Sequence, residues 1–162
     1  MNATATTQKK QTDLKFPFAS VQSEPSRRRI LVVEDDIELM TVVDHVVKLI
    51  DPKMGRDWVS NVEQAIVLLQ EQVRKGNSKP YDLILVDIFL EGEGTGFDLW
   101  KLCQEHFPEV PIVVTSAMPM EKFFRAIGSE DISPPFLPKP FKPSECKQLL
   151  EGILEYSESK KG

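Results

Sequence analysis

The chain has 162 residues with a net charge of −5, and 41% of its residues are hydrophobic and 28% charged, as in one soluble globular domain. No apolar run approaches the roughly 20 residues that a membrane-spanning helix needs, and the N-terminus lacks the apolar centre of a secretory signal. We therefore expect a cytoplasmic protein without membrane contact, and the net negative charge argues against DNA binding.

The first part of the chain, residues 1–28, is polar and shows no hydrophobic period. We expect a disordered N-terminal tail there, because the segment has too little apolar area to offset the entropy of ordering it. Positive charge gathers at its end in Arg27, Arg28 and Arg29. We interpret these arginines as a solvated leader to the first strand.

Strands and helices alternate from Ile30 onward. The segment RILVVED, residues 29–35, begins as a short run rich in β-branched residues and predicts a buried strand. Residues 36–51 carry apolar side chains at helical spacing, and Asp36 is expected to cap this helix. Pro52 ends it.

The middle of the chain continues this alternation. A second short strand is predicted over residues 56–60. Ser60 and Glu63 have the spacing of a capping box, which predicts that the next helix begins there, and Gly76 predicts its end. The segment YDLILVD, residues 81–87, is the third predicted strand.

The remaining elements follow the same order. They are a helix over 96–107, a strand over 110–116, a short helix over 120–128, a strand over 134–138 and a helix over 143–158. Strands that are apolar throughout, joined by helices, favour a parallel sheet with right-handed crossovers. We therefore predict a three-layer α/β domain over residues 29–157, with a C-terminal tail over 158–162.

The chain has two cysteines, Cys103 and Cys146. Their spacing matches no metal-binding or redox motif. We expect two free thiols on or under helices.

Polar side chains stand at the ends of several predicted strands. They are Glu34 and Asp35 after the first strand, Asp87 after the third, Thr115 and Ser116 after the fourth, and Lys139 after the fifth. In a doubly wound sheet the functional crevice lies outside the carboxyl ends of the strands, so these residues should meet at one edge. A single acid at a strand end is often only the cap of the next helix, but the complete set favours a common site.

The side-chain types in this set suit phosphoryl transfer. Three carboxylates are hard ligands for a divalent cation such as Mg²⁺ or Mn²⁺. An aspartate is an established nucleophile that forms an acyl phosphate. The transferred group carries negative charge on its oxygens, which a cation, the Lys139 ammonium and the Ser116 hydroxyl can meet. Asp87, at the tip of the central strand, is the expected phosphoacceptor.

Four segments, in order, resemble the receiver domain of bacterial two-component response regulators. They are ILVVEDD, YDLILVD, PIVVTSA and FLPKPF, and the resemblance covers about Arg29 to Tyr156. It implies a five-stranded parallel sheet with strand order 2-1-3-4-5, as in the flavodoxin-like doubly wound fold. The residues after Lys139 suffice for one helix and a tail, so we expect a stand-alone, single-domain receiver.

The resemblance also assigns roles to the matching residues. It implies that Glu34 and Asp35 form the acidic metal pair and that Asp87 is the phosphoacceptor and third acidic ligand. The backbone carbonyl of Phe89 would also bind the metal. Ser116 would be the switch hydroxyl, Phe136 the switch aromatic, and Lys139 would close the site. Ser116 is preferred to Thr115 because the residue that follows it, Ala117, is small as in the family. The bond before Pro140 is expected to be cis.

The resemblance implies a phosphorylation-dependent switch. Its phosphodonor would be a sensor histidine kinase or a histidine phosphotransfer protein, and its output would be binding to a downstream protein that the sequence does not identify. Its own chemistry would be limited to self-phosphotransfer and slow self-dephosphorylation, so we expect no enzyme in the ordinary sense. The alternative is a receiver-like adaptor that is never phosphorylated, against which the full set of acids, hydroxyl and lysine argues.

Two other classes share part of the pattern. A phosphatase of the haloacid dehalogenase type also has an aspartate after a buried strand, but it needs a second one two residues later, where this chain has Phe89. Flavodoxin-like flavin binding needs a phosphate-cradling loop after the first strand, where this chain has the acids Glu34 and Asp35. Both classes are therefore disfavoured.

The chain departs from the family pattern in three places. The second helix region, residues 61–80, is long. The loop after Asp87 is one residue longer than usual and has Glu91 where proline is common, so its shape stays open. Between Ser116 and Lys139 the fourth helix is short and the approach to the fifth strand is long. Because this region often carries output in the family, the identity of the partner cannot be taken over from the resemblance.

Overall fold

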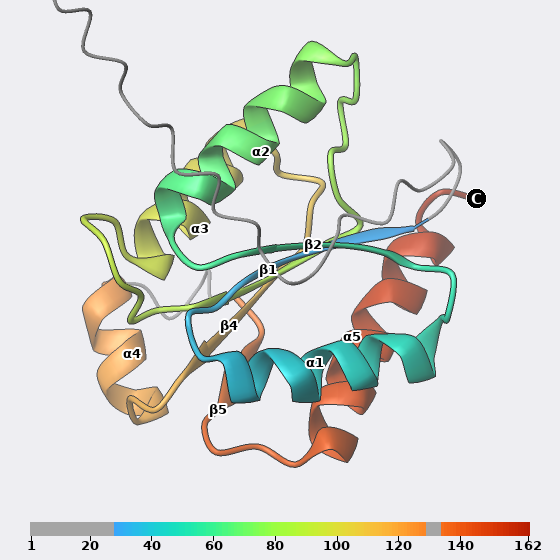
Figure 1. Ribbon diagram of the computed structural model, residues 1–162. Helices are drawn as coiled ribbons and strands as arrows, with labels where there is room; N and C mark the ends of the chain where they lie inside the picture. The colour runs from blue at the N-terminus through green and yellow to red at the C-terminus, as the bar shows by residue number, and fades with distance from the viewer. Residues whose placement is uncertain (1–27, 129–133) are drawn as a thin grey trace, which may run out of the picture.

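Five parallel strands form one sheet in the order β2-β1-β3-β4-β5, with helices on both faces (Figure 1). This computed structural model describes residues 28–128 and 134–162, and it confirms the predicted three-layer α/β architecture and strand order. The strands are β1 (Arg29–Val33), β2 (Gly55–Val59), β3 (Leu83–Asp87), β4 (Ile112–Ser116) and β5 (Phe136–Pro138). The helices are α1 (Ile37–Ile50), α2 (Val62–Arg74), α3 (Gly96–His106), α4 (Met120–Ile127) and α5 (Pro143–Ser159).

Two hydrophobic layers enclose the sheet. Helices α2, α3 and α4 pack on one face, and helices α1 and α5 pack on the other. The central strand shows the division, because Ile84 and Val86 belong to the first layer whereas Leu83 and Leu85 belong to the second. Alternate side chains of a strand point to opposite faces, so a strand covered on both faces is apolar throughout, as its sequence predicts.

The start of α1 follows the sequence prediction, but the start of α2 does not. The carboxylate of Asp36 accepts hydrogen bonds from the amides of Glu38 and Leu39, so Asp36 is the expected N-cap. The predicted capping box of Ser60 and Glu63 is wrong. Asn61 is the N-cap, and its side chain accepts from the amide of Gln64 at 2.9 Å. Asparagine caps a helix as well as serine does, and the Glu63 carboxylate binds a different segment.

The predicted tail over 1–28 lies outside the described residues except for Arg28. Arg28 does not extend into solvent as part of a leader, because its guanidinium pairs with Asp51 at 3.3 Å and with Glu158 at 3.4 Å. The second expected leader residue in the described range, Arg29, is the first residue of β1. No helix within 28–128 or 134–162 is long and apolar enough to cross a membrane.

A polar network occupies the amino-terminal end of the sheet. Arg29 pairs with Asp57, and the hydroxyl of Tyr81 donates to the same carboxylate at 2.7 Å. The guanidinium of Arg29 also lies over the Tyr81 ring, 5.5 Å from its centroid. Burial raises the pKa of Tyr81, and the Asp57 carboxylate raises it further. The phenol is therefore a neutral donor that joins β1, β2 and the entry to β3.

The two cysteines are free and fully buried, Cys103 on the inner side of α3 and Cys146 on the inner side of α5. Burial raises the pKa of each thiol to about 12. The thiolate is the reactive form of cysteine, so both side chains serve as small apolar core residues.

We expect neither thiol to react with iodoacetamide in the native protein at mildly alkaline pH, because thiolate formation and access are both suppressed. Both thiols should react once denaturant unfolds the chain. Mass spectrometry of the labelled protein measures the outcome. Rapid labelling of Cys103 or Cys146 in the folded protein would contradict the packing described above.

Helix α3 begins directly against the backbone of β3. A Cβ atom on Gly96 would lie 2.2 Å from the carbonyl oxygen of Asp87, and the Gly96 amide donates to the carbonyl of Ile88 at 3.0 Å. Only glycine fits this contact, which places the start of α3 beside the end of the central strand.

Substitution Gly96→Ala should therefore destabilise the protein by about 2 kcal/mol or more, because the clash is with backbone. Gly152→Ala is the matched control, since a Cβ there meets nothing within 4 Å in α5, and it should stabilise by about 0.5–1 kcal/mol. Urea unfolding measures both. Equal effects of the two substitutions would contradict the close contact at Gly96.

Candidate functional site

Three acidic side chains meet at the carboxyl ends of β1 and β3. Carboxylate oxygens of Glu34, Asp35 and Asp87 lie within 4.8 Å of one another. Glu34 is 3% exposed and Asp87 is 7% exposed, whereas Asp35 is only partly buried. The sheet topology thus brings together the three acids that the sequence places after different strands. We call them the acid cluster.

Lys139 joins two members of the acid cluster. Its ammonium contacts the Oδ2 of Asp87 at 2.7 Å and the Oε2 of Glu34 at 2.8 Å. The backbone holds this position, because the Lys139 amide donates to the carbonyl of Ser116 at 2.9 Å. The Lys139–Pro140 bond is cis, as expected. Residues far apart in the chain therefore form one ionic group.

The electrostatic balance of this group favours a bound cation. Burial raises the pKa of Glu34, although the bonds from Lys139 and from the Asp36 amide oppose the shift. Burial alone would lower the pKa of Lys139, but its bonds to Asp87 and Glu34 outweigh that effect and raise it. The acid cluster thus has three carboxyl groups and one ammonium, which contacts two of them. Hard oxygen donors with excess negative charge fit a divalent cation such as Mg²⁺.

Two further predicted residues lie at the same edge. The hydroxyl of Ser116, fully buried at the end of β4, accepts from the amide of Met118 at 3.0 Å. The amide of Phe89 donates to the Oδ1 of Asp87 at 3.2 Å, and the Phe89 side chain is 58% exposed. Thr115, the alternative to Ser116, is also buried, and its hydroxyl has no hydrogen-bond partner among the described residues. The roles of these residues stay predictions.

The predicted switch aromatic, Phe136, packs against α4. Its ring centroid lies 5.0 Å from that of Phe123 in α4, and Phe123 in turn stacks on Phe97 of α3 at 5.2 Å. Phe136 is partly buried against the α2–α3–α4 layer. An aromatic row therefore connects β5 with α4 and α3.

Sequence reasoning missed two contacts to the acid cluster. The indole N–H of Trp58 donates to the backbone carbonyl of Glu34 at 3.2 Å, and the amide of Glu91 donates to the Oδ2 of Asp35 at 3.1 Å. A signal for Trp58 existed, because it stands near the end of a strand expected beside the first one. No such signal existed for Glu91, since a loop rich in glycine has no hydrophobic period.

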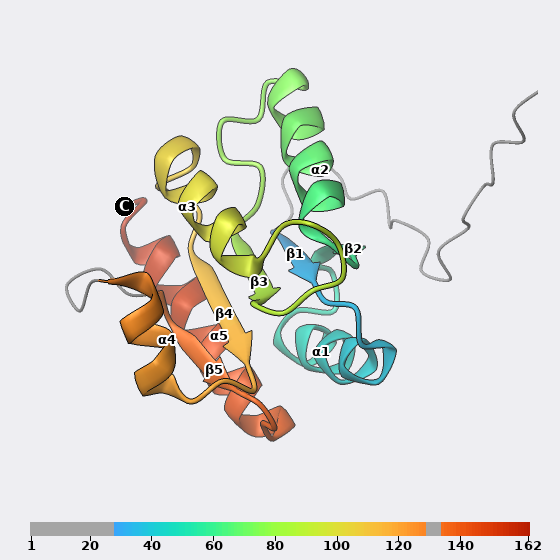
Figure 2. The ribbon, with the colours of Figure 1, turned by 90° about the vertical axis from the view of Figure 1, so that its left-hand side faces the viewer.

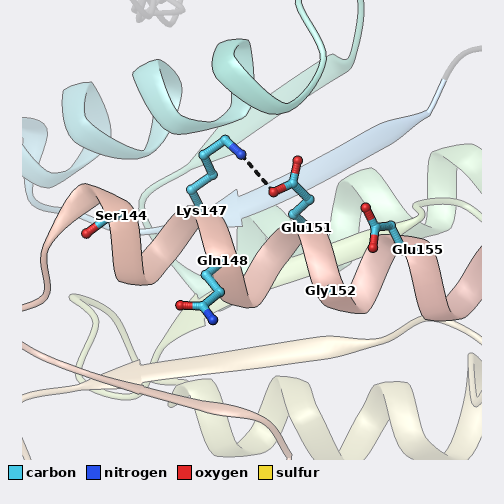
Figure 3. A pocket seen from close by; sticks show the side chains of 6 residues that line it. All are labelled: Ser144, Lys147, Gln148, Glu151, Gly152 and Glu155. Atoms are coloured by element: carbon cyan, nitrogen blue, oxygen red, sulfur yellow. Dashed lines mark hydrogen bonds and ion pairs between the residues drawn. The ribbon is translucent and has the colours of Figure 1, made fainter.

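A hollow along α5 shares no residue with the acid cluster, and Figure 3 shows the side chains that line it. Its lining residues all belong to α5: Ser144, Lys147, Gln148, Glu151, Gly152 and Glu155. Lys147 and Glu151 pair with each other at 2.7 Å. None of the predicted site residues lines this hollow, so the acid cluster is the candidate site.

Comparison with known families agrees with the fold. A family model described as the response regulator receiver domain matches residues 30–151. This range contains all five strands apart from the first residue of β1. It also contains the acid cluster, Ser116 and Lys139.

Individual proteins show the same likeness. The 3',5'-cyclic-nucleotide phosphodiesterase regA of Dictyostelium discoideum is 28% identical over 142 residues, which are 84% of this chain and 16% of that protein. The transcriptional regulatory protein CpxR of Klebsiella pneumoniae is 30% identical over 130 residues, which are 80% of this chain and 50% of that protein. The chain therefore spans half or less of the length of these relatives.

A solved structure shares the fold. The crystal structure of a CheY-like response regulator receiver domain protein from Methanospirillum hungatei aligns with a TM-score of 0.65 and 16% identity. The alignment covers 83% of this chain and 99% of that one. At this identity the likeness shows the architecture alone.

Lys139→Met should destabilise the protein at neutral pH by about 3 kcal/mol, because it leaves Glu34 and Asp87 buried without counter-charge. Lys101→Met on the exposed side of α3 is the control and should change stability by less than about 0.5 kcal/mol. The loss of stability caused by Lys139→Met should become smaller as the pH falls. Glu34 already has a raised pKa, so the folded state binds its proton more readily than the unfolded state, and stability falls as the pH rises.

Urea unfolding of both variants across a pH series measures this prediction. A loss for Lys139→Met that is independent of pH would show that the ammonium does not balance the acid cluster.

Proposed function

The chain belongs to the response regulator receiver family, and we propose that it is a phosphorylation-dependent signalling switch that accepts a phosphoryl group on Asp87. The observation that carries this proposal is the Lys139 ammonium bound to both Asp87 and Glu34 within the acid cluster. A lysine beside an acidic nucleophile supplies counter-charge to a transferred phosphoryl group. A structural ion pair alone needs one carboxylate, whereas three converge here.

The chain itself carries out a single phosphoryl transfer, followed by hydrolysis. A carboxylate oxygen of Asp87 attacks the phosphorus of the donor, the bond from phosphorus to the donor atom breaks, and the leaving group keeps that electron pair. Lys139 and Ser116 are proposed to bind phosphoryl oxygens. Glu34, Asp35, Asp87 and the carbonyl of Phe89 would hold a divalent cation such as Mg²⁺ or Mn²⁺, which supplies further counter-charge when bound. The acyl phosphate is later lost to water.

Ser116 and Phe136 are proposed to transmit the change. Ser116 would exchange its bond from the Met118 amide for one to a phosphoryl oxygen, and Phe136 would follow it inward. Phe136 contacts Phe123 of α4, so this movement would alter the packing of α4. A discrete repacking of this kind couples a local charge to a surface.

The proposed partners follow from this chemistry. The phosphodonor is a sensor histidine kinase or a histidine phosphotransfer protein in the cytoplasm, and the output is binding to a downstream protein rather than to DNA or a membrane. The part of the chain that accepts the phosphoryl group is the receiver domain over residues 29–157. No turnover of an external substrate is proposed.

Incubation with acetyl phosphate and Mg²⁺ should add one phosphoryl group to the wild-type protein, and mass spectrometry of the intact chain measures the added mass. Asp87→Asn should gain none, because an amide is not a nucleophile for this step. Asp35→Ala or removal of Mg²⁺ by a chelator should suppress the adduct. An equal adduct on Asp87→Asn would refute the assignment of Asp87, and no adduct on the wild type would favour the adaptor alternative.

A further inference from the structure

The loop between β3 and α3, residues 88–95, is fastened to a helix that carries none of the predicted site residues. We call it the β3–α3 loop. The amide of Gly94 donates to the Oε1 of Glu63, in the first turn of α2, at 2.9 Å. Figure 2 shows the loop leaving β3 and arching past the near end of α2 before it enters α3. Glu63 therefore forms a strap between α2 and this loop.

Two further observations show that the loop is seated on Glu63. Gly92 has a φ of +113°, and a Cβ there would lie 2.9 Å from the Oε2 of Glu63, so the loop backbone passes close to the carboxylate. Backbone amides of Glu63 itself and then of Gly94 stabilise the carboxylate and hold the pKa of Glu63 below its usual value. Glu63 is thus an ionised acceptor at neutral pH.

The same loop contacts the acid cluster. The Glu91 amide donates to the Oδ2 of Asp35 at 3.1 Å, and Asp35 is the most exposed member of the cluster. Lys139 contacts Glu34 and Asp87, so the loop supplies the bond that orients the third acid. A chain of contacts therefore runs from Glu63 through the loop backbone to Asp35.

We propose that Glu63 is a positioning residue for cation binding: it holds the β3–α3 loop on α2, which keeps the Glu91 amide on Asp35 and sets the affinity of the acid cluster for Mg²⁺. The proposal rests on the proposed function only in treating the acid cluster as a cation site. Partners that orient a ligand without touching the metal typically contribute 10–100-fold in affinity. The Glu91 amide is such a partner of Asp35, and Glu63 acts one contact further out by holding the loop that carries it.

Trp58 offers a direct readout. Its indole donates to the carbonyl of Glu34, so its fluorescence should respond when Mg²⁺ binds beside Glu34. Trp58→Phe should remove the response and leave only the signal of Trp100. Calorimetric titration with Mg²⁺ gives the same affinities without a reporter.

Glu63→Ala should weaken Mg²⁺ binding by about tenfold. Glu63→Gln keeps an oxygen that can accept from the Gly94 amide, so it should restore most of the affinity. Glu71→Ala removes an exposed carboxylate from the same helix and should leave the affinity unchanged. Without Mg²⁺, amide hydrogen exchange at Gly94 and Glu91 should be faster in Glu63→Ala than in the wild type.

The outcomes separate the two proposals. If the wild type shows no Mg²⁺ binding that Asp35→Ala abolishes, the cation site of the proposed function fails. If that binding exists but Glu63→Ala binds Mg²⁺ as the wild type does, only the role of Glu63 fails. If Glu63→Gln is as weak as Glu63→Ala, the negative charge of Glu63 acts through space, and the strap is refuted.

Discussion

Repulsion between carboxylates in a small and mostly buried volume is the constraint on which this structure depends. Glu34 and Asp87 are almost inaccessible, and their oxygens lie within 4.8 Å of each other and of Asp35. Like charges at such distances oppose ionisation and cost stability. Lys139 offsets part of that cost with contacts of 2.7 and 2.8 Å. The negative charge that remains unbalanced is what suits the site to a cation, so the same repulsion that strains the fold supports the proposed function.

The parallel sheet makes this arrangement possible. Lys139 and Glu34 are 105 positions apart in the chain, yet each directly follows a strand, and parallel strands end at the same edge. Both faces of the sheet are covered by helices, which leaves that edge as the place where polar groups meet. The helices that follow are also anchored there, α1 by the cap at Asp36 and α3 by the contact of Gly96 with Asp87. The site is thus held by rigid elements on several sides.

The sequence predicts the elements that follow a periodic hydrophobic pattern and the residues that stand at the ends of such elements. Apolar strands, their order through the family resemblance, the cap at Asp36 and the convergence of the acids all follow from such patterns. The sequence pattern misplaces the cap of α2 by one residue, because Ser60 and Asn61 are both good caps and only the backbone path decides between them. The contact of Glu63 has no sequence signal, because it depends on the path of an irregular loop. Trp58 stands near the end of a strand expected beside the first one, but its contact with Glu34 depends on the strand register. Predicted roles for Ser116 and Phe136 concern a second state and stay predictions.

The β3–α3 loop shows why family motifs alone do not fix the properties of this site. A glycine-rich loop loses much conformational entropy when it is ordered, so it needs additional contacts to hold one shape. Here those contacts are made by Glu63 on α2 and by Asp35 in the acid cluster. Asp35 thereby becomes both a proposed cation ligand and an anchor for the loop, and its orientation depends on how firmly α2 holds the other side. The proposed strap therefore ties the cation affinity of the acid cluster to a helix outside the motifs, so that a substitution on α2 alters the site without touching any of its residues.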